Sequence, residues 1–217
     1  MAAAADPGTQ TSAWRQCLSD KSHEAIEACT RIILLDPSRD GAFVNRGIAY
    51  RREGRVDRAI GDYTEAIRLN PQAADAFNNR GNGYQSIGEF QRALRDYSHA
   101  IRLNPSHAHA YNNRGVVFLE LHDPRRAIED FDEAVRRDPS YANAFRNRGI
   151  AHADLKLFEL AIQDFEEAFR LERFPLRRSN AVSAVPGVVG ALVWREEIER
   201  GGDEGAHLVV GARPCGA

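Results

Sequence analysis

Residues of the same type recur every 34 positions along most of this chain. Prolines, glycines, two sets of alanines and one set of aromatic residues each appear four times at this interval. The sets are Pro37, Pro71, Pro105 and Pro139; Gly47, Gly81, Gly115 and Gly149; Ala59, Ala93, Ala127 and Ala161; Ala66, Ala100, Ala134 and Ala168; and Tyr63, Tyr97, Phe131 and Phe165. An internal repeat of this length indicates an array in which each unit packs on its neighbours.

The pattern within one unit predicts two helices. In the first full unit, apolar residues at helical spacing predict a helix from about Ala42 to Arg52, and a break follows at Glu53-Gly54. The second helix carries Ala59 and Tyr63 and ends at Asn70-Pro71. Proline lacks an N–H group and restricts the residue before it, so the helix stops there.

Small residues at fixed positions predict close packing between these helices. We expect the glycine at the eighth position of each unit and the alanines of the second helix to let two backbones approach, while the aromatic residues fill the remaining space. In the third unit, Asp123 followed by Pro124 predicts a helix N-terminus with a capping side chain.

The order of aromatic, Gly, Tyr/Phe, Ala, Tyr/Phe, Ala and Pro within 34 residues resembles the tetratricopeptide repeat. The resemblance implies an all-α fold, a right-handed superhelical solenoid of antiparallel helix pairs. Four units match the pattern, at residues 40–73, 74–107, 108–141 and 142–175. His152 and Arg137 depart from it, and Arg173 stands where proline is expected, which predicts that the last helix runs past the usual boundary.

The rest of the chain lies outside these four units. Residues 13–39 resemble a degenerate first unit, because Ala25 and Pro37 fall in register, and residues 1–12 are expected to form a flexible lead. Residues 176–217 are rich in glycine and are expected to be a disordered tail, to contain a capping helix over Val188 to Arg200, or both.

Composition argues against several kinds of partner. The 217 residues contain 29 Lys+Arg and 31 Asp+Glu, so no summed charge favours nucleic acid or an anionic membrane. The longest apolar stretch, Ala181 to Trp194, contains Pro186 and Gly187 and is shorter than the roughly 20 residues that cross a bilayer. We therefore expect no membrane span.

Asparagine recurs at the sixth position of every full unit, and further asparagines stand beside it. This asparagine ladder consists of Asn45, Asn78, Asn79, Asn82, Asn112, Asn113 and Asn147. A primary amide has a donor and an acceptor and so matches a peptide backbone of any sequence. The ladder resembles those of tetratricopeptide proteins in which amides hold the main chain of a bound peptide. In the alternative interpretation these amides bond to neighbouring helices or solvate a groove.

Arginines directly follow the sixth-position asparagines, and aspartates recur in the second helix. The two sets are Arg46, Arg80, Arg114 and Arg148, and Asp62, Asp96, Asp130 and Asp164. Their common register predicts structural ion pairs between helices, because guanidinium engages carboxylate through two parallel hydrogen bonds. Capture of an anion by the arginines would require them to be unpaired.

The sequence contains no convincing motif for metal binding or catalysis. His107, His109 and nearby His99 supply at most two ligands at one repeat junction, so we predict no metal site. The sequence has no nucleophile elbow, phosphate loop or zinc-protease motif, and we predict no catalytic residue and no cofactor. The chain is not expected to be an enzyme.

The three cysteines indicate in which cellular compartment the protein could reside. Cys17 and Cys29 flank the loop of the degenerate first unit, where a disulfide would hold a helical hairpin together, while Cys215 would remain unpaired. The segment around them resembles small exported tetratricopeptide proteins of bacteria. Met1 to Gln10 lacks the features of a secretory signal. A periplasmic or secreted location is expected if a signal has been removed; otherwise the protein is cytoplasmic and the thiols are free.

Taken together, the sequence predicts a non-catalytic scaffold that binds an extended segment of a partner protein in its concave groove. Residues such as Arg51, Arg52 and Glu120 would influence which segment binds, but the sequence does not identify the partner. The alternatives are a structural protein that assembles with copies of itself, so that a homo-oligomer stays open, and the regulatory module of an enzyme complex.

Overall fold

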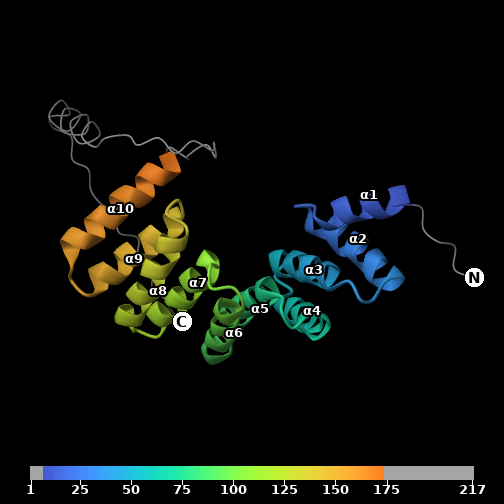
Figure 1. Ribbon diagram of the computed structural model, residues 1–217, viewed down its shortest axis with the longest axis horizontal. Coiled ribbons are helices and arrows are strands. Elements are labelled where there is room, and N and C mark those ends of the chain that lie inside the picture. Colours follow the sequence, from blue (N-terminus) through green and yellow to red (C-terminus); the bar gives the residue numbers. More distant parts are fainter. Residues whose placement is uncertain (1–6, 174–217) are drawn as a thin grey trace, which may run out of the picture. The chain divides into compact units, whose positions relative to one another are not determined.

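The computed structural model describes residues 7–173, and every regular element in this range is an α-helix. The helices follow one another in five pairs, one for each predicted unit (Figure 1). Their bounds are α1 Pro7–Cys17 and α2 Ser22–Leu35; α3 Asp40–Arg52 and α4 Val56–Leu69; α5 Ala74–Ser86 and α6 Phe90–Leu103; α7 Ala108–Glu120 and α8 Pro124–Arg137; α9 Ala142–Asp154 and α10 Phe158–Arg173. None of these helices is long and apolar enough to span a membrane.

Helix ends occur where the sequence predicts them. Helix α3 ends at Arg52, and Gly54 after it has a φ of 75°, a left-handed conformation that glycine adopts without steric cost. Helix α4 ends at Leu69, immediately before Asn70-Pro71. The predicted cap of α8 is confirmed, since the Asp123 side chain accepts a hydrogen bond from the backbone N–H of Arg126.

At the two ends of the array, the observed helix boundaries differ from those of a regular repeat unit or from those predicted. Helix α1 begins at Pro7, inside the segment 1–12 that was expected to be a flexible lead. Proline suits the first helical turn because the N–H group it lacks has no partner there. At the other end, α10 reaches Arg173, two residues beyond the position equivalent to the end of α8. The predicted capping helix at 188–200 lies outside the described residues.

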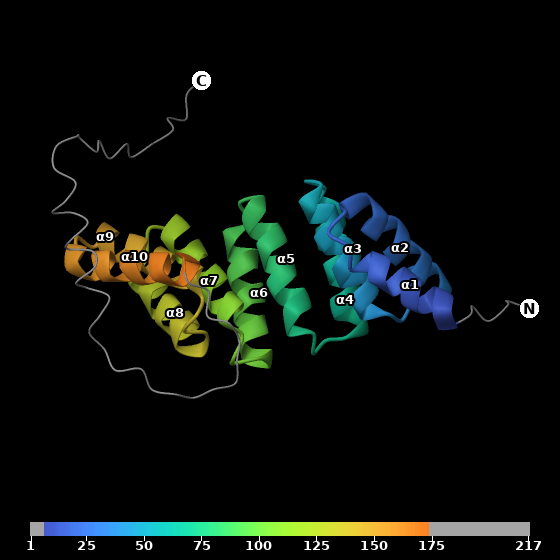
Figure 2. The same cartoon turned by 90° about the horizontal axis from the view of Figure 1, so that it is seen from above.

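The pairs stack as an α-helical solenoid. Each helix packs on the next one along the chain, and the first helices of successive pairs also contact each other: α1 with α3, α3 with α5, α5 with α7 and α7 with α9. Among the described helices, no second helix contacts another second helix. The first helices therefore lie on the inner side of the stack (Figure 1), and Figure 2 shows the same row of pairs from above.

The core repeats with the sequence. A typical buried cluster joins Phe77 of α5, Ala100 of α6 and Ala110 of α7, and thus takes one residue from each of three consecutive helices. The next cluster joins Tyr111 of α7 and Ala134 of α8 to α9 in the same way. Because each cluster spans two units, burial of apolar surface depends on the neighbouring unit.

Each repeated glycine lies against the aromatic ring of the second helix in its unit. A Cβ atom at Gly115 would lie 2.6 Å from a ring carbon of Phe131, and the same overlap occurs at Gly47, Gly81 and Gly149. The glycine therefore makes room for the aromatic ring of the second helix. The three nearest atoms at each of these positions belong to that ring, which fills the space that a side chain would take.

Candidate functional site

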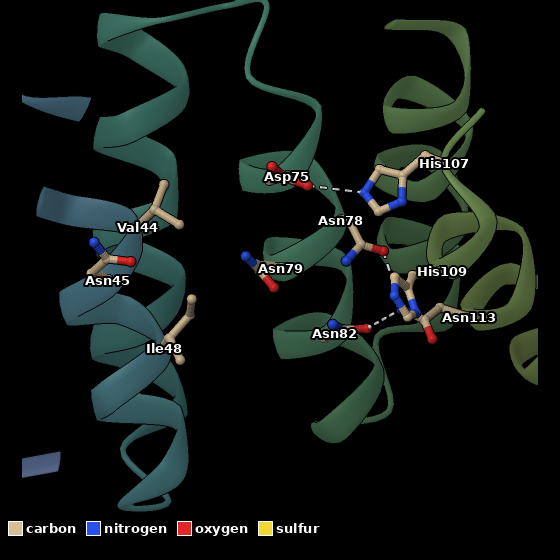
Figure 3. Close-up of a pocket in the computed structure, with 10 residues that line it drawn as sticks. All are labelled: Val44, Asn45, Ile48, Asp75, Asn78, Asn79, Asn82, His107, His109 and Asn113. Atoms are coloured by element: carbon tan, nitrogen blue, oxygen red, sulfur yellow. Dashed lines mark hydrogen bonds and ion pairs between the residues drawn. The ribbon is translucent and has the colours of Figure 1, made fainter. Parts of the chain in front are cut away.

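The inner side of the array contains a groove formed by α3, α5 and α7 (Figure 3). Its volume is about 400 Å³. The lining residues are Val44, Asn45, Ile48, Asp75, Asn78, Asn79, Asn82, His107, His109 and Asn113. Five of the seven predicted ladder asparagines thus share one groove with two apolar side chains and a few ionisable ones.

Many ladder amides hydrogen-bond to one another across helices. The amide nitrogen of Asn113 in α7 donates to the oxygens of Asn78 and Asn82 in α5, at 3.1 and 3.0 Å (Figure 3). Asn147 in α9 donates to Asn112 in α7 at 2.9 Å, and Asn112 donates to Asn113. For these five residues the structure matches the alternative interpretation, in which the amides tie neighbouring helices together.

Two ladder residues are different. Among the described residues, the side chains of Asn45 and Asn79 make no hydrogen bond, and both are partly exposed in the groove. Comparison of equivalent repeat positions explains why the Asn79 side chain has no hydrogen-bond partner. Its counterpart Asn113 donates to two asparagines of the preceding unit, but the equivalent positions before Asn79 are Val44 and Ile48, which cannot accept. Asn79 is therefore left with free donor and acceptor groups.

A second pocket extends the groove toward the C-terminal ends of the first helices. It has a volume of about 610 Å³ and shares Asn82 with the first pocket. Its other lining residues are Arg51, Gln85, Ser86, Gly88, Phe90 and Glu120. Arg51 and Glu120 were expected to influence partner choice, and they line this pocket with opposite charges. Arg52 pairs with Asp20 at 3.4 Å and does not line it.

A buried tyrosine supports the floor of this region. The Tyr97 hydroxyl lies 2.8 Å from the Asn82 side-chain oxygen and 2.7 Å from that of Gln85. The hydroxyl of Tyr63, one unit earlier, is buried and has no hydrogen bond of normal geometry. Burial raises the pKa of Tyr63 to about 12, although nearby Arg51 acts in the opposite direction.

This contrast predicts opposite effects for one substitution. We expect Tyr97→Phe to lower the free energy of unfolding by about 1 kcal/mol, because amide groups lose a buried partner. Tyr63→Phe should leave it unchanged or raise it by up to about 1 kcal/mol, because an unsatisfied hydroxyl is removed. Urea denaturation followed by circular dichroism measures both. Equal losses in the two variants would contradict the hydrogen-bond assignment.

The three histidines do not converge on one point. His99 stacks on Phe77 with ring centroids 4.1 Å apart, and it lines neither groove pocket. His107 Nε2 lies 3.1 Å from Asp75 Oδ1 without the alignment of a hydrogen bond. Burial lowers the pKa of His107, so its ring is neutral at pH 7. In the described part of the chain, no group of three His, Cys, Asp or Glu side chains could hold a metal ion.

The four repeated arginines each bond to the aspartate 16 residues later. Arg114 Nε and Nη2 donate to the two carboxylate oxygens of Asp130 at 2.8 and 2.7 Å, a bidentate contact. Arg46 with Asp62, Arg80 with Asp96 and Arg148 with Asp164 repeat the arrangement. The hydrogen bond to Asp130 raises the pKa of Arg114. Since all four guanidinium groups are engaged, the condition for anion capture is not met.

Each of these arginines has a second partner that sequence inspection missed. The remaining guanidinium nitrogen of Arg114 donates to the Ser98 hydroxyl of the preceding unit at 3.0 Å. The acceptors in the other units are Thr30, Thr64 and Asp132. They lie 34 residues apart, so the repeat contained the signal. Each arginine therefore links the second helices of two adjacent units.

At the N-terminal end, a disulfide joins Cys17, the last residue of α1, to Cys29 in α2. Both residues are buried and pack with Ala28, Trp14 and Ile32. The cross-link holds together the helix pair that departs most from the repeat.

Thiol counting tests this cross-link in the protein itself. Protein purified without reductant and then denatured should show one free thiol per chain, from Cys215, and three after reduction. Three free thiols before reduction would mean that Cys17 and Cys29 are unpaired. That result would also remove the argument for an oxidising compartment.

Comparisons with known proteins agree with this architecture. Tetratricopeptide repeat models match residues 74–107 and 115–175, and a TPR repeat model matches residues 47–88. A crystal structure of MamA is 26% identical, with coverage of 70% of this chain and 89% of that chain and a TM-score of 0.62. No curated protein matches the sequence.

Two further structures share the fold at lower identity. MamA residues 41 to the end from Desulfovibrio magneticus RS-1 are 20% identical, with coverage of 78% of this chain and 96% of that chain and a TM-score of 0.66. YrrB, described as a TPR protein with an unusual peptide-binding site, is 20% identical, with coverage of 78% and 88% and a TM-score of 0.59.

The stacked helix pairs and the inner groove define a helical-repeat scaffold for protein interactions. The repeat positions and the matching models specify the family further: the chain is a tetratricopeptide repeat protein.

Proposed function

We propose that this protein binds an extended peptide segment of a partner in the groove between α3, α5 and α7. The observation that carries the proposal is the pair of free amides, Asn45 and Asn79, beside the apolar side chains Val44 and Ile48. An amide can donate to a peptide carbonyl and accept from a peptide N–H group. The similarity in fold to YrrB, a TPR protein with an unusual peptide-binding site, also supports peptide binding by this chain.

The proposal divides the asparagine ladder into two parts. Asn45 and Asn79 contact the peptide, whereas Asn78, Asn82, Asn112, Asn113 and Asn147 hold the first helices in place through their mutual bonds. A rigid groove lowers the entropic cost of binding. Each peptide bond contact contributes only about 0.5–1.5 kcal/mol, so affinities in the micromolar range are expected. Arg51 and Glu120 favour peptide side chains of opposite charge to their own.

The test uses 12-residue peptides selected on the wild-type protein from a random displayed library. Asn45→Ala/Asn79→Ala should raise the Kd of a selected peptide about 10- to 100-fold in fluorescence anisotropy. Asn104→Ala, at an asparagine outside the groove, is the control and should bind normally. Methylation of the peptide's backbone nitrogens should also weaken binding. An unchanged Kd in the double variant, with the fold intact, would contradict the proposal.

A second pair of variants separates the free amide from the apolar wall. Val44→Asn recreates the acceptor that Asn78 offers to Asn113, and so pairs Asn79 without removing it. Val44→Ala shortens the same side chain but leaves Asn79 free. Binding should weaken more in Val44→Asn than in Val44→Ala. The reverse order would indicate that the apolar contact, and not the amide, is what the peptide uses.

A further inference from the structure

One face of α10 carries a row of apolar side chains that the described residues cover only in part, through Gly149 beside Phe165 and the Arg173 guanidinium over Phe169. Phe158, Ile162, Phe165 and Phe169 are 57%, 57%, 41% and 49% exposed. Helix α10 is the last of the described helices and lies at one end of their row (Figure 1). We call these four residues the α10 stripe.

In the preceding units, the residues equivalent to the stripe pack against the following helix. Phe131, the equivalent of Phe165 one unit earlier, is fully buried and packs with Ala151 of the following first helix. Val135, the equivalent of Phe169, packs on the buried cluster that contains Ala144 of the same following helix. The α10 stripe is thus the array's own helix-packing surface, and no helix among the described residues packs on it.

The spacing and size of the stripe suit another helix. Its residues are separated by four, three and four positions, the a/d pattern of a helix seam. Their exposed area is about 400 Å², since a phenylalanine side chain can bury about 150–250 Å². Two such faces together give about 800 Å² of apolar area, and a polar rim brings the total past the roughly 1,000 Å² of a specific interface.

The helix dipole favours one arrangement of two such helices. The charged side chains of the last turns of α10 are largely compensated within the helix, since Arg170 pairs with Glu167 and Glu172 lies in the same turn. An antiparallel pair opposes the two helix dipoles. A two-fold axis produces this arrangement from two identical chains.

We propose that two copies of this chain associate through the α10 stripe, with their α10 helices antiparallel about a two-fold axis. The opposite end of the array makes a poorer partner, because α1 carries mostly polar side chains. The inference does not depend on peptide binding, since the stripe and the inner groove share no residue.

The mass of the full chain in solution is the first test. Sedimentation equilibrium from about 1 to 100 μM should show a concentration-dependent shift toward twice the mass of one chain. Ile162→Glu/Phe169→Glu should raise the dimer dissociation constant at least about 100-fold, because it buries carboxylates without partners. Both side chains are exposed in a single chain, so helicity and melting temperature should stay unchanged.

The matched control is Leu34→Glu/Leu35→Glu, which changes two exposed leucines of α2 and should leave the dimer intact. A wild-type monomer at every concentration would overturn the inference and would point to another occupant, either this chain's own residues 174–217 or a different protein. Dimers that persist in Ile162→Glu/Phe169→Glu would also overturn it.

Cross-linking locates the contact. In a Cys215→Ser background, Glu166→Cys places a thiol at an exposed position next to Phe165, on the flank of the stripe, and should cross-link two chains on oxidation. Asp132→Cys, at the equivalent exposed position of α8, should not. Equal cross-linking at both positions would contradict the assignment of the interface to α10.

Discussion

Arg114→Met is expected to lower the free energy of unfolding by about 3–5 kcal/mol, the range for a buried charge that loses its partner. The substitution leaves Asp130, which is only 4% exposed, without its bidentate hydrogen bonds. It also breaks the bond to Ser98 that links two adjacent units. Urea denaturation monitored by circular dichroism gives the difference directly.

Two comparisons separate the buried ion pair from other effects of losing an arginine. Arg136→Met removes a surface arginine that pairs with Glu133 within α8, and it should cost less than about 0.5 kcal/mol. Arg114→Met/Asp130→Asn should recover part of the loss, because no buried charge remains. If Arg136→Met is as destabilising as Arg114→Met, burial of the pair is not the cause.

The cost of Arg114→Met should also depend on pH. Burial raises the pKa of Asp130, and Arg114 opposes this shift, so without Arg114 the folded-state pKa rises further above its unfolded value. A carboxyl group with a raised folded-state pKa loses stability as pH rises. The deficit relative to wild type should therefore be smaller at pH 4 than at pH 7. A deficit that grows on acidification would contradict this sign.

Gly115→Ala should lower the free energy of unfolding by about 2–3 kcal/mol, the cost of overpacking a filled core. The new methyl group would lie 2.6 Å from a ring carbon of Phe131, which is itself fully buried. Normal carbon contacts are about 3.5–4.0 Å. The same denaturation measurement applies.

Gly61→Ala is the matched control for this prediction. Gly61 lies inside α4, and no atom is within 4 Å of a Cβ placed there. Alanine favours a helix over glycine by about 1 kcal/mol, so this variant should be more stable than wild type. Gly115→Ala and Gly61→Ala should thus shift stability in opposite directions. Stabilisation by both would mean that the Phe131 ring can move aside.

Much of the fold could be predicted because its determinants are local and repeated. Asn70-Pro71 ends a helix and Asp123-Pro124 starts one through backbone chemistry that involves neighbouring residues only. The start of α1 at Pro7 was missed, since that unit lacks the repeated glycine and offered only Ala25 and Pro37 as register marks. The exposure of the α10 stripe follows from where the units end, and its residues look like any other core positions.

The sequence by itself determined the period, the helix pairs and the register that brings Arg114 to Asp130, because residues 16 apart in adjacent helices meet again in every unit. The tertiary structure decided which asparagines are free. Asn79 and Asn113 occupy the same repeat position, yet only Asn113 finds oxygen acceptors on the preceding first helix. A hydrogen bond needs a partner within about 3 Å, and side chains more than 30 residues apart are brought that close only by packing of adjacent units.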